Sequence, residues 1–258
     1  MLAKRIIPCL DVKDGQVVKG INFEGLREVG DPVEMGAFYS AHGADELVYL
    51  DISASSEGRR TFTDLVSRIA ERIDIPFTVG GGISSFEDAA RLLDAGADKI
   101  TINTAAVLQP EIITRIASRY GSQFVVVAID ARMVASTSLN ENAYWQVMTH
   151  GGKTPTDKEL YFWAKEVQNL GAGEILFTSM DHDGTRNGYA VEAYSRLAEE
   201  LTIPVIASGG AGSVADIEEV LTTGRADAAL AASIFHYGEI SIPELKRTLR
   251  THGVNVRI

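Results

Sequence analysis

Two aspartates that end apolar runs have the clearest capacity for acid–base chemistry in this chain. Asp11 closes the run 6–10, and Asp130 closes the run 124–129. A carboxyl group at the end of a buried strand is costly unless it is hydrogen-bonded or used in function. Two such groups beside one substrate can divide the work, one ionised as base and one protonated as acid, when their surroundings separate their pKa values. The alternative for each aspartate is a hydrogen-bonded turn cap without a catalytic role.

Two glycine-rich turns repeat each other in register. The stretch Ile203-Pro-Val-Ile-Ala-Ser-Gly-Gly-Ala-Gly212 passes from a strand-like run into glycines and then into a helical pattern, and Ile75-Pro-Phe-Thr-Val-Gly-Gly-Gly-Ile-Ser84 does the same. Glycine lets backbone N–H groups approach an anion closely, and the N-terminus of the following helix carries about half a positive charge. The pattern predicts two phosphate cradles, which suit an elongated ligand with a phosphate at each end. The alternative is that only the second turn binds phosphate.

The composition limits the classes of protein to consider. Hydrophobic residues make up 45% of the 258 residues, and the net charge is −11. An acidic surface disfavours nucleic-acid binding, which needs basic residues to displace counterions. The apolar runs are too short for a membrane span or a signal peptide, so we expect a cytoplasmic protein that binds neither nucleic acid nor membrane.

Cysteine and histidine usage argues against a metal centre. The single cysteine, Cys9, excludes an intramolecular disulfide and a multi-cysteine zinc site, and its apolar neighbours favour a buried, inert thiol over a nucleophile. No two histidines stand at the spacing of metal ligands, and His182 and His236 are expected in loops. We therefore expect neither a metal nor another cofactor.

The elements that must position these residues alternate along the chain. Strand-like runs are expected at 5–11, 47–52, 77–80, 99–103, 124–130, 175–179, 205–208 and 228–232. Helical periodicity is expected at 32–42, 62–72, 86–95, 110–120, 160–170, 190–200 and 214–223. Alternation of this kind, with nearly continuously apolar strands, is typical of a closed parallel sheet. We therefore expect one α/β domain over residues 1–258, a (β/α)8 TIM barrel. The first turn lacks the G-x-G-x-x-G of a doubly wound nucleotide-binding sheet.

The internal repeat extends beyond the glycine turns. Ala97-Asp-Lys-Ile-Thr-Ile-Asn-Thr104 aligns with Ala226-Asp-Ala-Ala-Leu-Ala-Ala-Ser233, and Asp11 aligns with Asp130. The first four strands therefore correspond to the last four. This predicts two fused half-barrels, at about 1–120 and 121–258, with the two aspartates facing each other across the barrel mouth.

Active sites of such barrels lie at the C-terminal ends of the strands, so polar residues at those ends are the candidates. They are Asp11, Asp51, Gly82, Asn103, Thr104, Asp130, Thr178, Asp183, Ser208, Gly210 and Ser233. One cradle would combine Gly82 with Asn103 and Thr104. The other would combine Gly210 with Ala232 and Ser233.

Two further features place charge near the ends of the expected barrel. The connection 13–31 is long and punctuated by glycine, so we expect a lid or binding loop in which Lys19 reaches a phosphate; a solvated surface lysine is the alternative. Charged residues also stand just before four strand-like runs: Arg5, Glu46, Lys99 and Glu174. Exposed strand starts are often charged, but mixed signs at one end of a barrel also predict a ring of salt bridges that closes the axial bore.

Several stretches spread along the chain match one known family. They are Arg5-Ile-Ile-Pro-Cys-Leu-Asp-Val-Lys-Asp-Gly15, Gly43-Ala-Asp-Glu-Leu47, Val79-Gly-Gly-Gly-Ile83, Gly171-Ala-Gly-Glu-Ile-Leu176, Asp181-His-Asp-Gly-Thr185, Ala207-Ser-Gly-Gly-Ala-Gly212 and Ala231-Ala-Ser-Ile-Phe-His236. Together they resemble the cyclase-subunit family of imidazole glycerol phosphate synthase, from histidine biosynthesis. The likeness covers essentially the whole chain.

The resemblance implies a lyase that acts on a bisphosphate, the phosphoribulosyl-formimino aminoimidazole carboxamide ribonucleotide. Ammonia from a separate glutaminase subunit would convert it into imidazole glycerol phosphate and the aminoimidazole carboxamide ribotide. By position, the resemblance implies that Asp11 is the general base and Asp130 the general acid. It implies these further roles: phosphate ligands Gly82, Asn103 and Thr104 at one end and Asp183, Gly184, Gly210, Ala232 and Ser233 at the other, a mobile-loop Lys19, and an ammonia gate of Arg5, Glu46, Lys99 and Glu174.

Two rival functions share parts of this pattern. A sister isomerase that opens the ribosyl ring of the preceding intermediate would share both aspartates and both cradles, but a free-standing isomerase needs no ammonia inlet. A non-catalytic bisphosphate-binding subunit predicts that Asp11→Asn leaves function intact. Two segments also depart from the family's pattern: the insert 136–142 is longer and more polar, and 155–162 lacks a glycine usual after the Pro-Thr pair.

Overall fold

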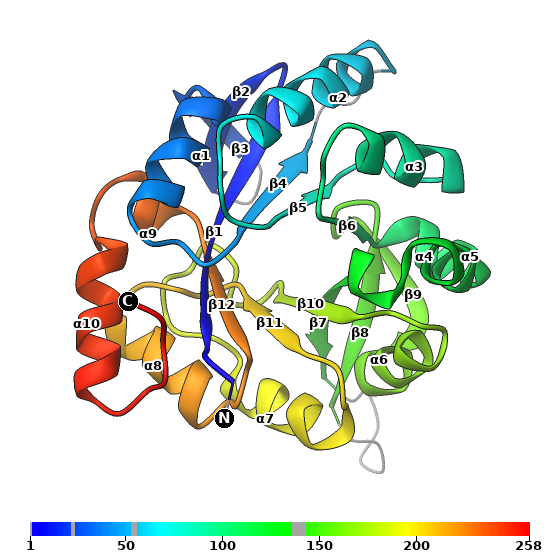
Figure 1. The fold of residues 1–258 in the computed structure, drawn as a ribbon. Helices are drawn as coiled ribbons and strands as arrows, with labels where there is room; N and C mark the ends of the chain where they lie inside the picture. Colours follow the sequence, from blue (N-terminus) through cyan, green and yellow to red (C-terminus); the bar gives the residue numbers. More distant parts are fainter. Residues whose placement is uncertain (1, 22–23, 53–55, 136–142) are drawn as a thin grey trace.

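The computed structural model describes residues 2–21, 24–52, 56–135 and 143–258 and contains a closed barrel of eight parallel strands (Figure 1). The barrel strands are β1 (Arg5–Lys13), β4 (Leu47–Asp51), β5 (Phe77–Gly80), β6 (Lys99–Ile102), β7 (Val125–Val134), β10 (Glu174–Ser179), β11 (Val205–Ser208) and β12 (Ala228–Ala231). Neighbours follow the order β10-β11-β12-β1-β4-β5-β6-β7, and the pairing of β7 with β10 closes the circle. The predicted (β/α)8 barrel is confirmed.

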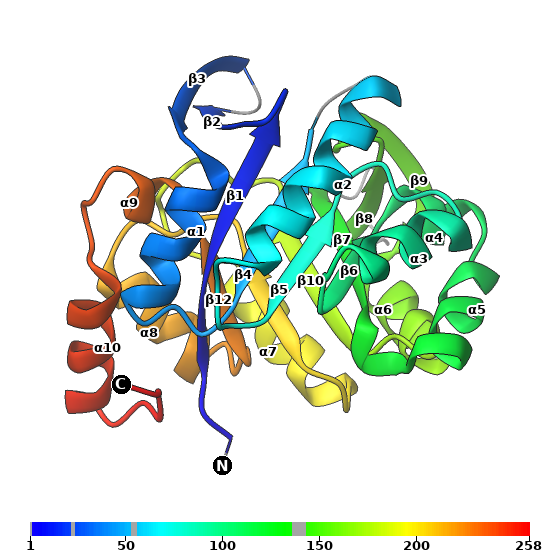
Figure 2. The same cartoon turned by 45° about the horizontal axis from the view of Figure 1, so that its top comes forward.

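Helices surround the barrel, as Figures 1 and 2 show. They are α1 (Pro32–Ala41), α2 (Ser56–Ala70), α3 (Phe86–Asp94), α4 (Thr104–Leu108), α5 (Glu111–Tyr120), α6 (Leu160–Asn169), α7 (Val191–Glu200), α8 (Val214–Thr222), α9 (Ser233–His236) and α10 (Ile242–Thr251), with the short 3₁₀ turn η1 (Ser122–Phe124). Each of the seven predicted helical ranges overlaps a helix. Helix α2 begins six residues before the predicted range 62–72; its first residues are polar, so apolar periodicity does not indicate them. Across the described ranges, no helix is both long and apolar enough to span a bilayer.

Two layers of apolar side chains hold the fold together. The larger layer lies between the strands and the helices. The smaller one fills the barrel interior, where its members include Ile7 and Cys9 of β1 and Val126 of β7. Side chains alternate between the two faces of a strand. Arg5 and Asp11 therefore belong to the same inward-facing set as Ile7 and Cys9, one at each end of β1.

The connection 13–31, which is predicted to be a lid or binding loop, consists largely of β-strand. It folds into an antiparallel hairpin, β2 (Gln16–Ile21) and β3 (Glu24–Gly30), which stands above the barrel in Figure 2. Asp14 and Gly15 have positive φ angles, 51° and 81°, and connect the paired residues Lys13 and Gln16. An Asp-Gly pair with positive φ at both positions is the preferred two-residue hairpin turn. The Asp14-Gly15 pair in the sequence therefore indicates the turn between β1 and β2.

The segment after Asp130 also forms more sheet than predicted. Strand β7 continues to Val134 and pairs with β8 (Tyr144–Thr149), which pairs with β9 (Thr154–Glu159). Strand β9 ends at Glu159, and α6 begins at Leu160, the first residue of the predicted helical range 160–170. The insert 136–142 lies outside the described residues.

Candidate active site

Asp11 and Asp130 stand on opposite sides of the barrel. In the circular strand order, three strands separate β1 from β7 in either direction. Both aspartates lie toward the C-terminal ends of their strands and are partly buried. The strand order thus places the two carboxyl groups across one mouth, as the acid–base hypothesis requires.

Asp130 lies in surroundings that favour its protonated form. Burial raises the pKa of Asp130 from the ordinary 3.8 to about 6, and the negative charge of Asp183 adds to this rise. Two donors act in the other direction: the Thr178 hydroxyl and the Asn103 amide, whose Nδ2 lies 2.9 Å from Asp130 Oδ2. A carboxyl group with a pKa near 6 exchanges its proton close to neutral pH, as an acid–base group should.

The first glycine turn follows β5 and lies beside the end of β6. Gly81 and Gly82 have φ angles of 97° and 65°, and a Cβ on Gly81 would lie 2.0 Å from the Asp51 carbonyl oxygen. Only glycine therefore fits against the end of β4, where Asp51 is buried. Asn103 and Thr104 follow β6, the neighbour of β5, so the structure brings the residues of the first predicted cradle together.

Thr104 has a partner that sequence reasoning missed. Its Oγ1 accepts a hydrogen bond of 2.9 Å from the backbone N–H of His150. His150, Gly151 and Gly152 form the β8–β9 turn and all have positive φ. The ribbon that extends from β7 therefore packs its turn against the first cradle.

The second glycine turn follows β11 and is held as closely. Gly209 and Gly210 have φ angles of 90° and 112°, and a Cβ on Gly210 would lie 1.9 Å from the Gly188 carbonyl oxygen. The other residues predicted for the second cradle lie on neighbouring elements: Asp183 and Gly184 after the end of β10, and Ala232 and Ser233 at the start of α9. The strand-end candidates Thr178 and Ser208 lie in β10 and β11.

The two cradles share details of local structure. Ser85 and Ser213 cap α3 and α8 from nearly the same backbone conformation, with φ of −142° and −146°. Asp98 and Asp227 accept the first backbone N–H of β5 and β11, each at 3.0 Å. These matches are what a repeat of two half-barrels predicts.

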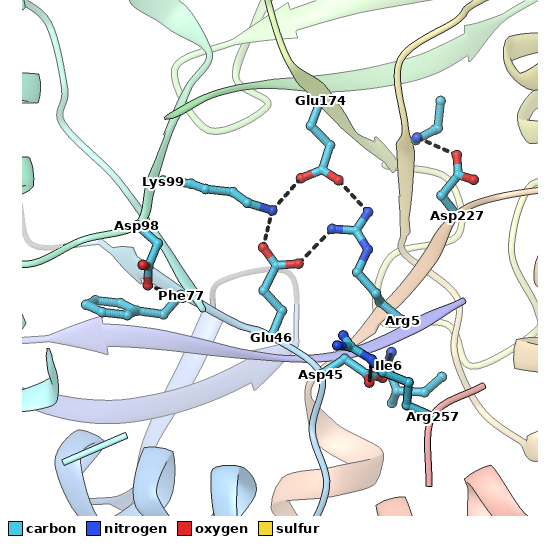
Figure 3. Close-up of polar contacts among 11 residues, drawn as sticks. Arg5, Ile6, Asp45, Glu46, Phe77, Asp98, Lys99, Glu174, Asp227 and Arg257 are labelled. Carbon is cyan, nitrogen blue, oxygen red and sulfur yellow. Dashed lines mark hydrogen bonds and ion pairs between the residues drawn. The ribbon is translucent and has the colours of Figure 1, made fainter. Parts of the chain in front are cut away.

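The four charged residues at the other end of the barrel form a closed ring (Figure 3). Arg5 bonds Glu46, with 2.7 Å from Nη1 to Oε2, and also bonds Glu174. Lys99 bonds Glu174, with 3.0 Å from Nζ to Oε2, and also bonds Glu46. Both glutamates are buried, while both cations are less than one-fifth exposed. The pKa of Arg5 is raised, because Glu174 and Glu46 outweigh the opposing effect of burial. Each cation thus bridges both carboxylates, which the alternative of exposed, independent strand starts does not explain.

A second charge cluster lies next to this ring and was not predicted. Asp45 forms a buried ion pair of 2.8 Å with Lys246, accepts the Ile6 N–H at 2.8 Å, and lies 3.2 Å from Arg257 Nε. Ile6 and Asp45 directly adjoin Arg5 and Glu46 in the sequence. The partners are far apart along the chain, so no periodic pattern indicated them.

The two histidines expected in loops, His182 and His236, both lie within hydrogen-bond distance of other side chains. His236, expected in a loop, ends α9 instead; Tyr39 OH lies 2.6 Å from its Nδ1, and the Cys9 carbonyl oxygen 2.9 Å from its Nε2. His182 lies between β10 and α7, with Ser179 Oγ 2.7 Å from its Nδ1. Lys19 lies in β2, but its side chain is outside the described part of the chain. Among the described residues, no three His, Cys, Asp or Glu gather as a metal-binding group.

Comparison with known proteins gives one consistent result. A family profile described as "Histidine biosynthesis protein" matches residues 5–241. The imidazole glycerol phosphate synthase subunit HisF of Phocaeicola vulgatus is 61% identical over 258 residues, which covers all of both chains. The subunits of the same name from Flavobacterium johnsoniae and Geobacillus thermodenitrificans are 56% and 57% identical over 258 and 257 residues, again across the full length of each chain.

Proposed function

The chain belongs to the histidine biosynthesis protein family, as a HisF-type subunit of imidazole glycerol phosphate synthase, and from this premise we propose its reaction and the residues that carry it. The substrate is the phosphoribulosyl-formimino aminoimidazole carboxamide ribonucleotide. Ammonia attacks the ribulosyl carbonyl carbon and the carbonyl oxygen leaves as water; the imidazole ring then closes, and a C–N bond breaks to release the aminoimidazole carboxamide part. The products are imidazole glycerol phosphate and the aminoimidazole carboxamide ribotide.

Asp130 acts as the general acid and Asp11 as the general base. The observation that carries this assignment is the pKa of Asp130, raised by burial to about 6, so that part of the population holds a proton near neutral pH. Asp130 donates that proton to the departing group, while Asp11 accepts a proton from the attacking nitrogen on the opposite side of the mouth. The circular strand order supports this division, because the strands that carry the two groups lie on opposite sides of the barrel.

The two cradles hold the two phosphates of the substrate. Gly82, Asn103 and Thr104 bind one phosphate through backbone N–H groups and the start of α4. Gly184, Gly210 and Ser233, with their neighbours, bind the other. The close backbone approaches at Gly81 and Gly210 support this role, because a side chain at either position would collide with the neighbouring backbone, at Asp51 and Gly188 respectively. Anchoring both ends fixes the reacting centre between the two aspartates.

The charged ring of Arg5, Glu46, Lys99 and Glu174 admits ammonia from a glutaminase partner that docks at that end of the barrel. The ring joins all four side chains, so its ion pairs must part before ammonia passes. Beyond the ring, Thr78 pairs with Val48, which lies in the barrel interior. Within the described residues the Thr78 hydroxyl is buried without a hydrogen-bond partner, which suits a path for a small polar molecule.

Turnover of the bisphosphate with ammonium salts at raised pH, where free ammonia is present, tests this function without any glutaminase. The purified chain should form imidazole glycerol phosphate. Isomerisation of the ring-closed precursor without ammonia would identify the rival isomerase instead.

Substitution of the catalytic acid separates the enzyme from a mere binding subunit. Asp130→Asn should reduce turnover by about 10²–10⁴-fold, the usual contribution of general acid–base catalysis, while substrate binding is largely retained. Asp11→Asn should show the same pattern. An unchanged turnover rate in both variants would contradict the acid–base assignment, whereas a non-catalytic binding subunit would show no turnover even before substitution.

A further inference from the structure

The side chain of Asn103 is not needed for the backbone conformation of the first cradle. Asn103 precedes α4 with φ −124° and ψ −83°, and Ala232 precedes α9 with φ −123° and ψ −75°. Alanine therefore supports the same backbone conformation in the second cradle. Asparagine often caps a helix N-terminus through its side chain, but within the described residues Asn103 makes no such bond.

The amide of Asn103 is directed at Asp130 instead. Its Nδ2 lies 2.9 Å from Asp130 Oδ2. The strand register explains this contact: Ile102 pairs with Val127, so Asn103 lies beside residue 128 and reaches the next inward-facing position on β7. The amide is thus fixed to the carboxyl group proposed as the acid.

The amide oxygen of Asn103, Oδ1, is buried and has no hydrogen-bond partner in the part of the chain that the structure describes. Oδ1 and Nδ2 exchange places when the amide turns about its last side-chain bond. An ionised Asp130 needs the Nδ2 donor, whereas a protonated Asp130 presents an O–H group that Oδ1 accepts. The amide can therefore match either protonation state of its neighbour.

The groups that favour the ionised form of Asp130 are neutral hydrogen-bond donors. Asp183, in the loop after β10, is the charged group that acts on Asp130, and it disfavours a second negative charge. Thr178 of β10 and Asn103 at the end of β6 donate hydrogen bonds and favour the carboxylate. Burial and the charge of Asp183 hold the proton on Asp130, and the two neutral donors act against them.

We propose that Asn103 is a positioning residue that sets the protonation state of Asp130, donating to its carboxylate and, with the amide turned, accepting from its protonated carboxyl. When Asp130 gives up its proton, the O–H bond breaks and the electron pair stays on the carboxylate, which the Nδ2 donor then stabilises. Reprotonation from solvent restores the acid. The inference rests on the proposed role of Asp130 as the acid.

The test is a direct titration of the Asp130 side-chain carboxyl carbon by NMR in the full chain, with Asp130→Asn identifying the resonance. Asn103→Leu removes the donor and fills the space, so the pKa of Asp130 should rise by about one to two pH units. Asp183→Asn is the matched control with the opposite sign, because removing a negative charge should lower that pKa. The alkaline limb of the pH profile of turnover should move in the same direction as the NMR value.

A merely structural role for Asn103 predicts a different result. Loosened packing would admit water beside Asp130, and its pKa would fall toward 3.8. Asn103→Ala is the second variant, chosen because Ala232 already adopts this backbone conformation. A rise in either variant supports the proposal, and an unchanged or lowered pKa in both overturns it. Full turnover by Asp130→Asn, by contrast, would overturn the proposed function and leave the titration result standing.

Discussion

Buried carboxyl groups lie at both ends of this barrel, but their charges are handled in opposite ways. At the closed end, Glu46 and Glu174 each contact two cations. At the mouth, Asp130 is faced by Asp183 and stabilised by neutral donors. At the end that holds the ring, each glutamate is paired with two cations, whereas at the mouth burial and the negative charge of Asp183 raise the pKa of Asp130 to about 6. The difference agrees with the proposed roles, a gate of paired charges at one end and proton transfer at the other.

The largest stability effect should come from unbalancing the charged ring. Arg5→Met leaves Glu46 and Glu174 with Lys99 as their shared cation. Removing one partner of a buried ion pair typically costs about 3–5 kcal/mol, and we expect the free energy of unfolding, measured by urea denaturation, to fall by about 3 kcal/mol.

The double variant Arg5→Met with Glu174→Gln is the matched control for this loss. It keeps one positive and one negative charge in the ring, so it should recover most of the stability. A loss below about 1 kcal/mol in the single variant would mean that the ring behaves as a set of exposed surface pairs.

At the mouth, ionisation of Asp130 should lower the stability of the folded protein. The pKa of Asp130 is raised in the folded protein from 3.8 to about 6, so the folded state holds this proton more tightly than the unfolded state. The stabilisation is present below pH 3.8 and is lost as the pH rises through about 6. Relative to Asp130→Asn, the unsubstituted chain should therefore lose about 2.4 kcal/mol of stability between pH 4 and pH 7, at about 1.36 kcal/mol per unit of pKa difference.

Asp88 provides a control with the opposite slope. Although its partial burial acts to raise its pKa, hydrogen bonds from Ser84 and Ser85 and the charge of Arg91 lower it overall. Asp88→Asn should therefore cost stability at neutral pH, and the cost should shrink as the pH falls. Urea denaturation of both variants across this pH range gives the pH dependence of their unfolding free energies. Equal pH dependences would contradict the opposite pKa shifts of Asp130 and Asp88.

The sequence predicted the barrel well because its signals are local. Alternating apolar runs and helical periods need no knowledge of distant residues, and the glycine turns and strand-end aspartates follow from the same register. The Asp14-Gly15 pair indicates the turn between β1 and β2, whereas the length and the glycines of the connection 13–31 indicate a loop. The Asn103–Asp130 bond and the contacts of Asp45 depend on which strands become neighbours, and this information appears only when the barrel closes.

The smallest effect should come from the outer edge of the closed end. Arg257→Gln removes a contact of 3.2 Å to Asp45, but the Arg257 side chain is 64% exposed and its ion pair is screened by water. Asp45 keeps the buried Lys246 at 2.8 Å and the Ile6 N–H at 2.8 Å. We expect the urea midpoint to change little, by less than about 1 kcal/mol in unfolding free energy, and ammonium-dependent turnover to stay the same. A large loss would show that the contact of Arg257 with Asp45 also supports the charged ring.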